Sequence, residues 1–460
     1  MITAITGRNA SGKTLWVEQF RRQTASDTLR YIAFHDTYGP SVDSAYYLQL
    51  RWNQHDIDAE TPTVREKLGT LTEADEALIR LFCLEETLDK YIITLSSGEL
   101  RKFQLVKALM SNPKILILDN PFIGLDAETR QQLRDLLQRI AHHYSPLTTQ
   151  SSMLQAQSSK PIDLYLVLAK SDDIPDYVER IIDMDHDGRE LSLAAYLAER
   201  PSFPTRVLSA DLEQAINHHS PKGLPSPVSV SGGFATGTRE VIRMTNVTIR
   251  YGERTILKNL NWTVRSGERW ALTGQNGSGK STLLSLVCAD NPQAYACDIA
   301  LFGHRRGEGG VSIWDIKRHI GYVSPELARS YHRDIPALRI VASGLKDTVG
   351  LYVRANDEEK AQCRFWMRVF GIEHLADRSF IRMSSGEQRL VLLARAFVKD
   401  PELLILDEPL HGLDNVNRQL VKDVIMAFCQ RPDKTLIMVT HYQEELPPCI
   451  THRIELKKNP

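Results

Sequence analysis

The chain has 460 residues, of which 42% are hydrophobic and 25% charged, and its formal net charge is −1. This length and composition indicate a globular protein of two or three domains, and the balanced charge argues against an extended nucleic-acid-binding surface. The start MITAITGRNASGKT lacks the regions of a signal peptide, and no stretch reaches about 18 consecutive apolar residues, so we expect any membrane role to be peripheral.

The first predicted element is the apolar strand ITAIT, which leads into the glycine-rich loop GRNASGKT and then into a helix-like run. The loop fits the pattern GxxxxGK[ST], in which backbone N–H groups and a helix N-terminus approach phosphate oxygens. The lysine of this pattern reaches the β and γ phosphates, and the final hydroxyl holds Mg²⁺. A glycine turn without function is the alternative reading. The predicted ligand-binding residues here are Gly7, Asn9, Gly12, Lys13 and Thr14.

Two further motifs follow in the first half. The stretch LSSGE (95–99) precedes a helix-like run, and KILILD (114–119) reads as a short buried strand of a parallel sheet. A carboxylate at the end of such a strand is placed to hold Mg²⁺ through water, although it is also a common turn residue. We therefore predict that Asp119 lies beside the phosphates and contributes to the magnesium site.

The second half repeats these elements. LILDNPFIGLD (116–126) and LILDEPLHGLD (404–414) match at eight of eleven positions, and a proline-, serine- and glycine-rich segment separates the copies. The repeat predicts a first domain over residues 1–200, a linker over 201–238 with room for one short helix, and a second domain over 239–460. The second lysine loop contributes Gly274, Asn276, Gly277, Gly279, Lys280, Ser281 and Thr282, and Asp407 ends the second strand; Ser281 and Asp407 are the predicted magnesium ligands.

Together these motifs resemble those of ATP-binding cassette (ABC) ATPases, whose signature loop usually reads LSGGQ. The run from TLLSLV to IGYVS (282–324) is similar to the tandem ABC ATPases of the ModF family, also called PhrA. The resemblance implies an α/β fold with two P-loop NTPase domains, each with a mainly parallel sheet and a helical subdomain that carries the signature motif. The corresponding signature residues are Ser96, Ser97 and Gly98 in the first copy and Ser384, Ser385 and Gly386 in the second.

The resemblance also implies an internal pseudo-dimer in which ATP lies between the lysine loop of one domain and the signature loop of the other. The two copies differ at the position that follows the strand-end aspartate, where the family places the acid that activates water. Glu408 can accept a proton, whereas Asn120 cannot. We therefore predict a mainly ATP-binding first site and a hydrolytic second site, with Lys280 and Glu408 among its catalytic residues.

Two other differences agree with this asymmetry. The resemblance makes His441 the switch histidine that contacts the γ phosphate, and the stretch LAK (168–170) answers VTH (439–441) without a histidine. It makes Tyr251 the aromatic residue that stacks on adenine, and the first copy starts too close to Gly7 to carry an equivalent. Either the natural chain begins further upstream or the adenine is held in another way.

Two functions stay open at this point. In the first, the chain hydrolyses ATP to energise a separate transmembrane permease, with molybdate suggested as solute by the family name alone. In the second, it is a soluble ATPase switch that acts in translation or DNA repair. The short, non-basic linker and the compact spacing between motifs favour transport, so we expect a cytoplasmic chain that attaches to the inner face of the membrane and does not bind nucleic acid stably. Six cysteines without a CxxC pair agree with a reducing compartment.

Overall fold

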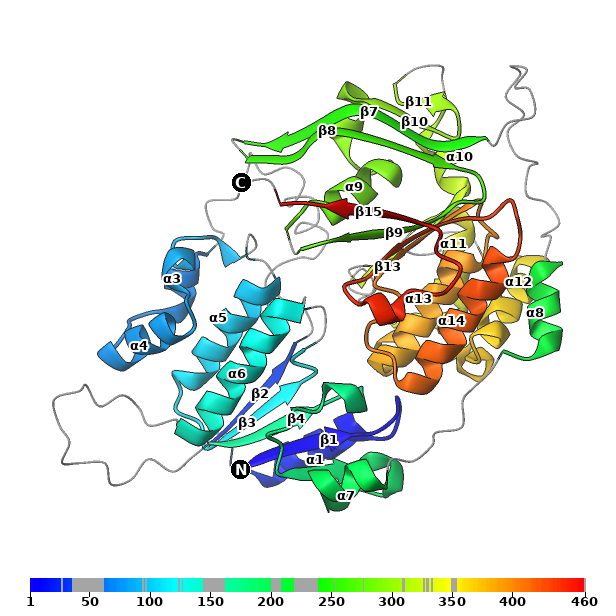
Figure 1. The fold of residues 1–460 in the computed structure, drawn as a ribbon. Coiled ribbons are helices and arrows are strands. Elements are labelled where there is room, and N and C mark those ends of the chain that lie inside the picture. Colours follow the sequence, from blue (N-terminus) through cyan, green and yellow to red (C-terminus); the bar gives the residue numbers. More distant parts are fainter. Residues whose placement is uncertain are drawn as a thin grey trace, which may run out of the picture. The chain divides into compact units, whose positions relative to one another are not determined.

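The chain forms two compact units, Met1–Phe203 and Pro204–Pro460 (Figure 1). The structure is a computed structural model. It describes residues 1–25, 28–34, 62–92, 95, 97–122, 125, 127–143, 162–199, 208–218, 239–252, 254–275, 277–307, 311–325, 327, 331, 334–348 and 354–458.

The first unit is built on a six-stranded sheet with the order β2-β3-β4-β1-β5-β6. Its strands are parallel except for the edge strand β6. The strands are β1 (Ile2–Thr6), β2 (Leu29–Ala33), β3 (Ile115–Asp119), β4 (Asp163–Val167), β5 (Arg180–Asp183) and β6 (Arg189–Ser192). The helices of eight or more residues are α1 (Lys13–Gln23), α4 (Glu73–Leu81), α5 (Ser97–Leu109) and α6 (Ala127–His143), joined by the shorter α3 (Val64–Leu68) and α7 (Leu193–Ala198).

Helices cover both faces of this sheet because alternate side chains of each buried strand point to opposite sides. Ile2 and Ala4 of β1 pack on the side of α5 and α6, whereas Ile5 packs with Val17 of α1 on the other side (Figure 1). Because β1 and β3 are parallel strands of one sheet, their carboxyl ends lie at the same edge of it. This edge carries the lysine loop and the strand-end aspartate.

The second unit repeats this sheet with five parallel strands in the order β12-β13-β14-β9-β15. They are β9 (Arg269–Gly274), β12 (Ile320–Val323), β13 (Leu403–Asp407), β14 (Thr435–Val439) and β15 (His452–Leu456). The surrounding helices are α9 (Lys280–Val287), α10 (Ile313–Arg318), α11 (Ala337–Lys346), α12 (Asp357–Val369), α13 (Ser385–Phe397) and α14 (Asn415–Cys429). The predicted α/β class with mainly parallel sheets is confirmed in both units.

An antiparallel sheet, β11-β10-β7-β8, adds a second layer to this unit. It consists of β7 (Glu240–Tyr251), β8 (Arg254–Arg265), β10 (Asp298–Leu301) and β11 (His304–Arg305). Its apolar side chains share one core with α9 and with one face of the parallel sheet. Within the described part of the first unit there is no counterpart of this sheet.

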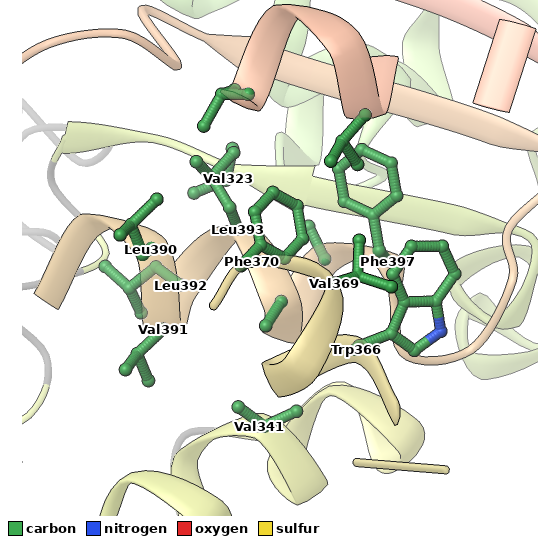
Figure 2. Packing of buried hydrophobic residues seen from close by; sticks show 14 of the residues in the cluster. Val323, Val341, Trp366, Val369, Phe370, Leu390, Val391, Leu392, Leu393 and Phe397 are labelled. Carbon is green, nitrogen blue, oxygen red and sulfur yellow. The ribbon is translucent and has the colours of Figure 1, made fainter. Parts of the chain in front are cut away.

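The helices α11, α12 and α13 pack into a region rich in aromatic residues beside the parallel sheet (Figure 2). Trp366 of α12 and Phe370, the residue just after this helix, lie against Phe397 of α13, with ring centroids 5.1 and 5.4 Å from that of Phe397. Each of these three side chains is fully buried. This packing fixes the direction of α13, the helix that begins at the second signature motif.

Part of the predicted linker is a helix that belongs to the second unit. Helix α8 (Ala210–Asn217) begins with Ser209 as its N-cap and buries Ile216 in the core shared by α11 to α14. Gln430, just after α14, donates to Glu213 at 2.7 Å and accepts from Asn217 at 2.6 Å. The linker is thus attached to the second unit at this helix.

Candidate functional site

Both lysine loops have the geometry of a phosphate cradle at the N-terminus of a helix. Gly12 and Gly279, the residues before α1 and α9, have φ of +91° and +95°, a conformation that side chains disfavour. The Lys280 Nζ donates to the carbonyls of Gly274 and Gln275 at 2.6 and 2.9 Å. The hydroxyl-bearing residues that follow the lysines, Thr14 and Ser281, are exposed, and Thr282 is half-buried.

The first loop repeats this arrangement, although three of its eight residues differ. The Lys13 Nζ donates to the carbonyls of Gly7 and Arg8 at 2.5 and 2.7 Å. Ala10 has φ +65° where the second loop has Gly277 at +78°. An alanine in this left-handed conformation costs roughly 1 kcal/mol, so the first loop keeps the cradle shape at some expense.

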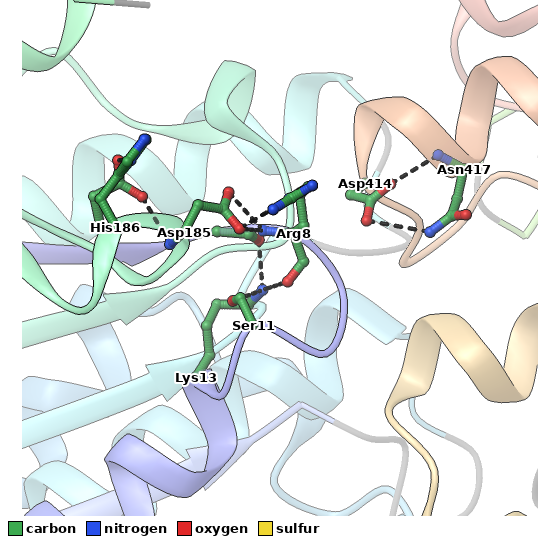
Figure 3. A network of polar contacts seen from close by, with 9 residues as sticks. Arg8, Ser11, Lys13, Asp185, His186, Asp414 and Asn417 are labelled. Atoms are coloured by element: carbon green, nitrogen blue, oxygen red, sulfur yellow. Dashed lines mark hydrogen bonds and ion pairs between the residues drawn. The ribbon is translucent and has the colours of Figure 1, made fainter. Parts of the chain in front are cut away.

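A turn after β5 holds the first loop from outside (Figure 3). The backbone N–H of Arg8 donates to both carboxylate oxygens of Asp185 at 3.0 Å, and its Nε donates to one of them at 3.1 Å. Asp183 in turn accepts from the Asp185 N–H at 3.0 Å and contacts His186 Nδ1 at 2.8 Å. No feature of the sequence motifs pointed to this contact.

In the second unit the antiparallel sheet supplies the neighbours of the lysine loop. A Cβ added to Gly279 would lie 2.9 Å from Ile256 of β8, so the strand and the loop approach as closely as a glycine allows. Tyr251 ends β7 and its hydroxyl accepts from Asn291 at 3.0 Å. The predicted adenine platform therefore belongs to the hairpin that packs on this loop. Asn276 lies outside the described residues, and Asn9 of the first loop is half-buried.

At the end of β3, the strand-end aspartate and the residue after it form hydrogen bonds to each other and to neighbouring residues. The Asp119 carboxylate accepts from the Tyr31 hydroxyl at 2.9 Å and from the Asn120 amide at 2.7 Å. The Asn120 Oδ1 accepts from the backbone N–H of Ala169 at 3.1 Å. Asn120 thus joins the ends of β3 and β4 through both ends of its amide, and it has no basic atom.

The end of β13 is different because Glu408 faces two histidines. The Glu408 carboxylate lies 2.8 Å from His411 Nδ1 and 3.2 Å from His441 Nε2, one imidazole at each oxygen. Burial by itself raises the pKa of Glu408, but hydrogen bonds and charge from the two histidines outweigh it and hold that pKa well below its usual range. The carboxylate is therefore ionised at neutral pH, and each of its two oxygens is oriented by one imidazole.

Strand register corrects the predicted counterpart of His441. Asn120 N–H donates to Val167 O, and Glu408 N–H donates to Val439 O, so Val167 and Val439 are equivalent. His441 then corresponds to Ala169, and the predicted pairing with Lys170 was wrong by one residue. At this position Ala169 offers its backbone N–H to Asn120, whereas His441 offers an imidazole to Glu408.

A buried arginine that the motif analysis missed supports the turn after each strand-end aspartate. Arg389 of α13 donates to the carbonyls of Asp407, Glu408 and Pro409 at 2.6, 2.5 and 3.3 Å. Burial lowers the pKa of Arg389 to about 10, against the opposing charges of Asp407 and Glu408. In the first unit Arg101 donates to Pro121 O at 2.8 Å. The sequence does contain a signal for this arginine, because GELRK (98–102) aligns with GEQRL (386–390) and both have arginine at the fourth position.

The second signature motif forms a capping box at the start of α13. The Ser384 side chain accepts from the Glu387 N–H at 3.3 Å, and Glu387 accepts from the Ser384 N–H at 2.8 Å. Ser385 and Gly386 form the first turn of this helix. In the first copy α5 begins at Ser97 with Gly98 next, whereas Ser96 lies outside the described residues. Glutamate completes this box, and the usual glutamine could do so as well, so the box does not explain the departure.

We expect Glu387→Gln to change thermal stability little, because the carboxamide oxygen still accepts from the Ser384 N–H. Glu387→Leu removes that acceptor and should cost about 1 kcal/mol, seen as a drop of a few degrees in Tm. Differential scanning calorimetry of both variants compares them directly. Equal losses for the two substitutions would contradict the capping role.

The chemistry of the available donors suits Mg²⁺ bound together with phosphate. Thr14 and Ser281 offer hydroxyl oxygens, and Asp119 and Asp407 offer carboxylate oxygens, the hard ligands that Mg²⁺ prefers. Among the described residues no group of three or more histidine, cysteine, aspartate or glutamate side chains forms a metal site by itself. The donors therefore fit an ion that takes the rest of its ligands from phosphate and water.

A family model and several known proteins match this chain. The family model described as ABC transporter matches residues 1–123 and 257–411. The chain is 40% identical over 387 residues to the ABC transporter ATP-binding protein ModF of Escherichia coli K12, covering 82% of this chain and 73% of that protein. It is 28% identical to the uncharacterized ABC transporter ATP-binding protein C323.04 of Schizosaccharomyces pombe, covering 81% and 70%. A structure of ribosome-bound archaeal Pelota and ABCE1 aligns with TM-score 0.57 at 18% identity, over 96% of this chain and 70% of that one.

Proposed function

The chain belongs to the ABC transporter family of ATP-hydrolysing proteins, and we propose that its first lysine loop serves an ATP-binding site and its second a hydrolytic one. The observation that carries this proposal is the contrast between Glu408 and Asn120. Glu408 is an ionised carboxylate oriented by two imidazoles, whereas the Asn120 amide is engaged by Asp119 and Ala169. Of these two side chains, only the Glu408 carboxylate can take a proton from water.

The first site retains what binding requires. Lys13 is held in its loop by two carbonyls, and Asp119 keeps its place at the end of β3. An uncharged Asn120 also removes repulsion against a triphosphate, which favours long residence of ATP. Loss of hydrolysis with retention of the cradle therefore fits a site that binds ATP and holds it.

Domains of this family dimerise and bind ATP, and we propose that each of the two lysine loops of this chain, residues 7–14 and residues 274–281, holds one nucleotide. In each, Mg²⁺ would be held by a lysine-loop hydroxyl and the strand-end aspartate, where it supplies positive charge to the phosphates. ATP bound in the first site would then stay there while the second site turns over.

The work done with this ATP is, in our proposal, the energising of a separate transmembrane permease. The relative at 40% identity carries the name of an ABC transporter ATP-binding protein, which supports transport. No helix among the described residues has the length and apolar character of a membrane span. The likeness to a ribosome-bound ABCE1 structure concerns the fold, since identity there is 18%.

The test uses the full chain with Glu408→Gln, which should hold ATP without hydrolysing it. Inside-out membrane vesicles and purified ribosomes are each incubated with this variant and sedimented with ATP or without nucleotide. We expect ATP-dependent sedimentation with vesicles and none with ribosomes. Sedimentation with ribosomes and none with vesicles would overturn the transport role and favour a switch in translation.

A further inference from the structure

The turn after β13 places a second histidine on the carboxylate that we assign as general base. His411 Nδ1 lies 2.8 Å from Glu408 Oε2, while His441 Nε2 lies 3.2 Å from Glu408 Oε1. An ionised carboxylate accepts hydrogen bonds only, so both imidazoles donate to it. Each oxygen of Glu408 thus has its own donor, from two different loops.

The backbone fixes His411 in this position. The His411 N–H donates to Glu408 O at 3.1 Å and closes a tight turn, which brings the imidazole back to the carboxylate three residues earlier. Leu410 and Leu413 on either side are fully buried in the core shared with α13 and α14. The His411 side chain itself is 23% exposed, which leaves it beside the site rather than in the core.

The first copy keeps this scaffold and loses the histidine. Phe122 and Leu125 are buried where the second copy has Leu410 and Leu413, and Arg101 binds Pro121 as Arg389 binds Pro409. The residue that answers His411 in the sequence is Ile123, whose structure lies outside the described residues. Packing alone therefore does not require a histidine here, and histidine occurs in the copy that has the glutamate.

We propose that His411 is a positioning residue for hydrolysis, which holds the Glu408 carboxylate toward the attacking water by a hydrogen bond to Oε2. This inference rests on the proposed role of Glu408 as general base. With a hydrogen bond from His441 alone, the Glu408 side chain can still rotate about its torsions and move its second oxygen. The bond from His411 removes that freedom and so raises the fraction of productive geometry.

The test compares three variants of the full chain in steady-state ATP hydrolysis. His411→Ile, which copies residue 123, should lower kcat roughly 10- to 100-fold, the effect of one hydrogen bond to a charged group, with KM for ATP nearly unchanged. His411→Asn places an amide N–H near the position of Nδ1 and should recover most of the lost kcat. His374→Ile changes an exposed histidine of the same unit and should leave both constants unchanged.

Several results would overturn the proposal. These are a kcat for His411→Ile within about twofold of the natural chain, an equal loss for His411→Asn, or a loss confined to KM. Should His411→Ile not fold, His411→Ala is measured against His411→Asn in the same way. Glu408→Gln is assayed beside them: if it keeps its rate, the assignment of the base itself fails, whereas a dead Glu408→Gln with a fully active His411→Ile defeats this inference alone.

Discussion

Glu408→Gln should reduce steady-state ATP hydrolysis about 10²- to 10⁴-fold, or roughly 3 to 5 kcal/mol of barrier. The substitution keeps the shape of the side chain and its ability to accept from His411 or His441. It removes the negative oxygen that takes the proton from water, so nucleotide binding should survive. Phosphate release measured against ATP concentration, with binding of a fluorescent ATP analogue as a second readout, separates these effects.

Asn120→Ala is the matched control for this substitution, since Asn120 answers Glu408 in the first unit. It removes the bonds to Asp119 and to the Ala169 N–H, so we expect a modest loss of stability in the first unit. Most of the hydrolysis rate should persist because the general base is untouched. If Asn120→Ala were as damaging as Glu408→Gln, the assignment of one binding and one hydrolytic site would be wrong.

Arg389→Leu should destabilise the second unit by about 3 to 5 kcal/mol. It leaves three carbonyls, of Asp407, Glu408 and Pro409, without their buried donor, and each such group costs about 1 to 3 kcal/mol before water relieves part of the loss. The turn that presents Glu408 should loosen as well, so the hydrolysis rate should fall. Urea titration read by hydrogen–deuterium exchange mass spectrometry follows the two units separately.

Two comparisons make the Arg389 result specific. Arg368→Leu removes an exposed arginine that pairs with Glu373 on the surface, and it should change stability little. Arg389→Lys keeps the charge but offers a compact ammonium instead of a fork, so it should recover only part of the loss. If the exchange protection of α13 and of the turn after β13 stays unchanged in Arg389→Leu, the three hydrogen bonds of Arg389 do not stabilise this region.

Much of the fold could be predicted because motifs mark its junctions. An apolar strand followed by GxxxxGK[ST] requires a parallel strand, a loop and a helix in that order, and its repetition gave two α/β units. The class, the family and ATP hydrolysis are confirmed. Each lysine loop lies between a strand and a helix, as the motif predicts, and Lys13 and Lys280 contact carbonyls of their own loops, which the motif did not predict. The roles of the site residues stay predictions.

Other features leave little trace in a single sequence. The stretches VLAK (167–170) and VTHY (439–442) share only their first residue, which marks their alignment weakly, whereas backbone hydrogen bonds identify Ala169 rather than Lys170 as the counterpart of His441. The contact between Asp185 and Arg8 joins residues 177 positions apart, beyond any local pattern. The predicted linker had room for one short helix, and α8 is such a helix, but its proline- and glycine-rich surroundings did not indicate that it packs in the core of the second unit.

The central claim is that ATP is hydrolysed at the second site and retained at the first. Rapid-quench mixing of the full chain with excess ATP, followed by gel filtration and identification of the bound nucleotide, tests it most directly. We predict an initial burst of no more than a single phosphate per chain and a single unhydrolysed ATP that stays bound. A burst of two phosphates per chain, or retention of ADP alone, would contradict the account.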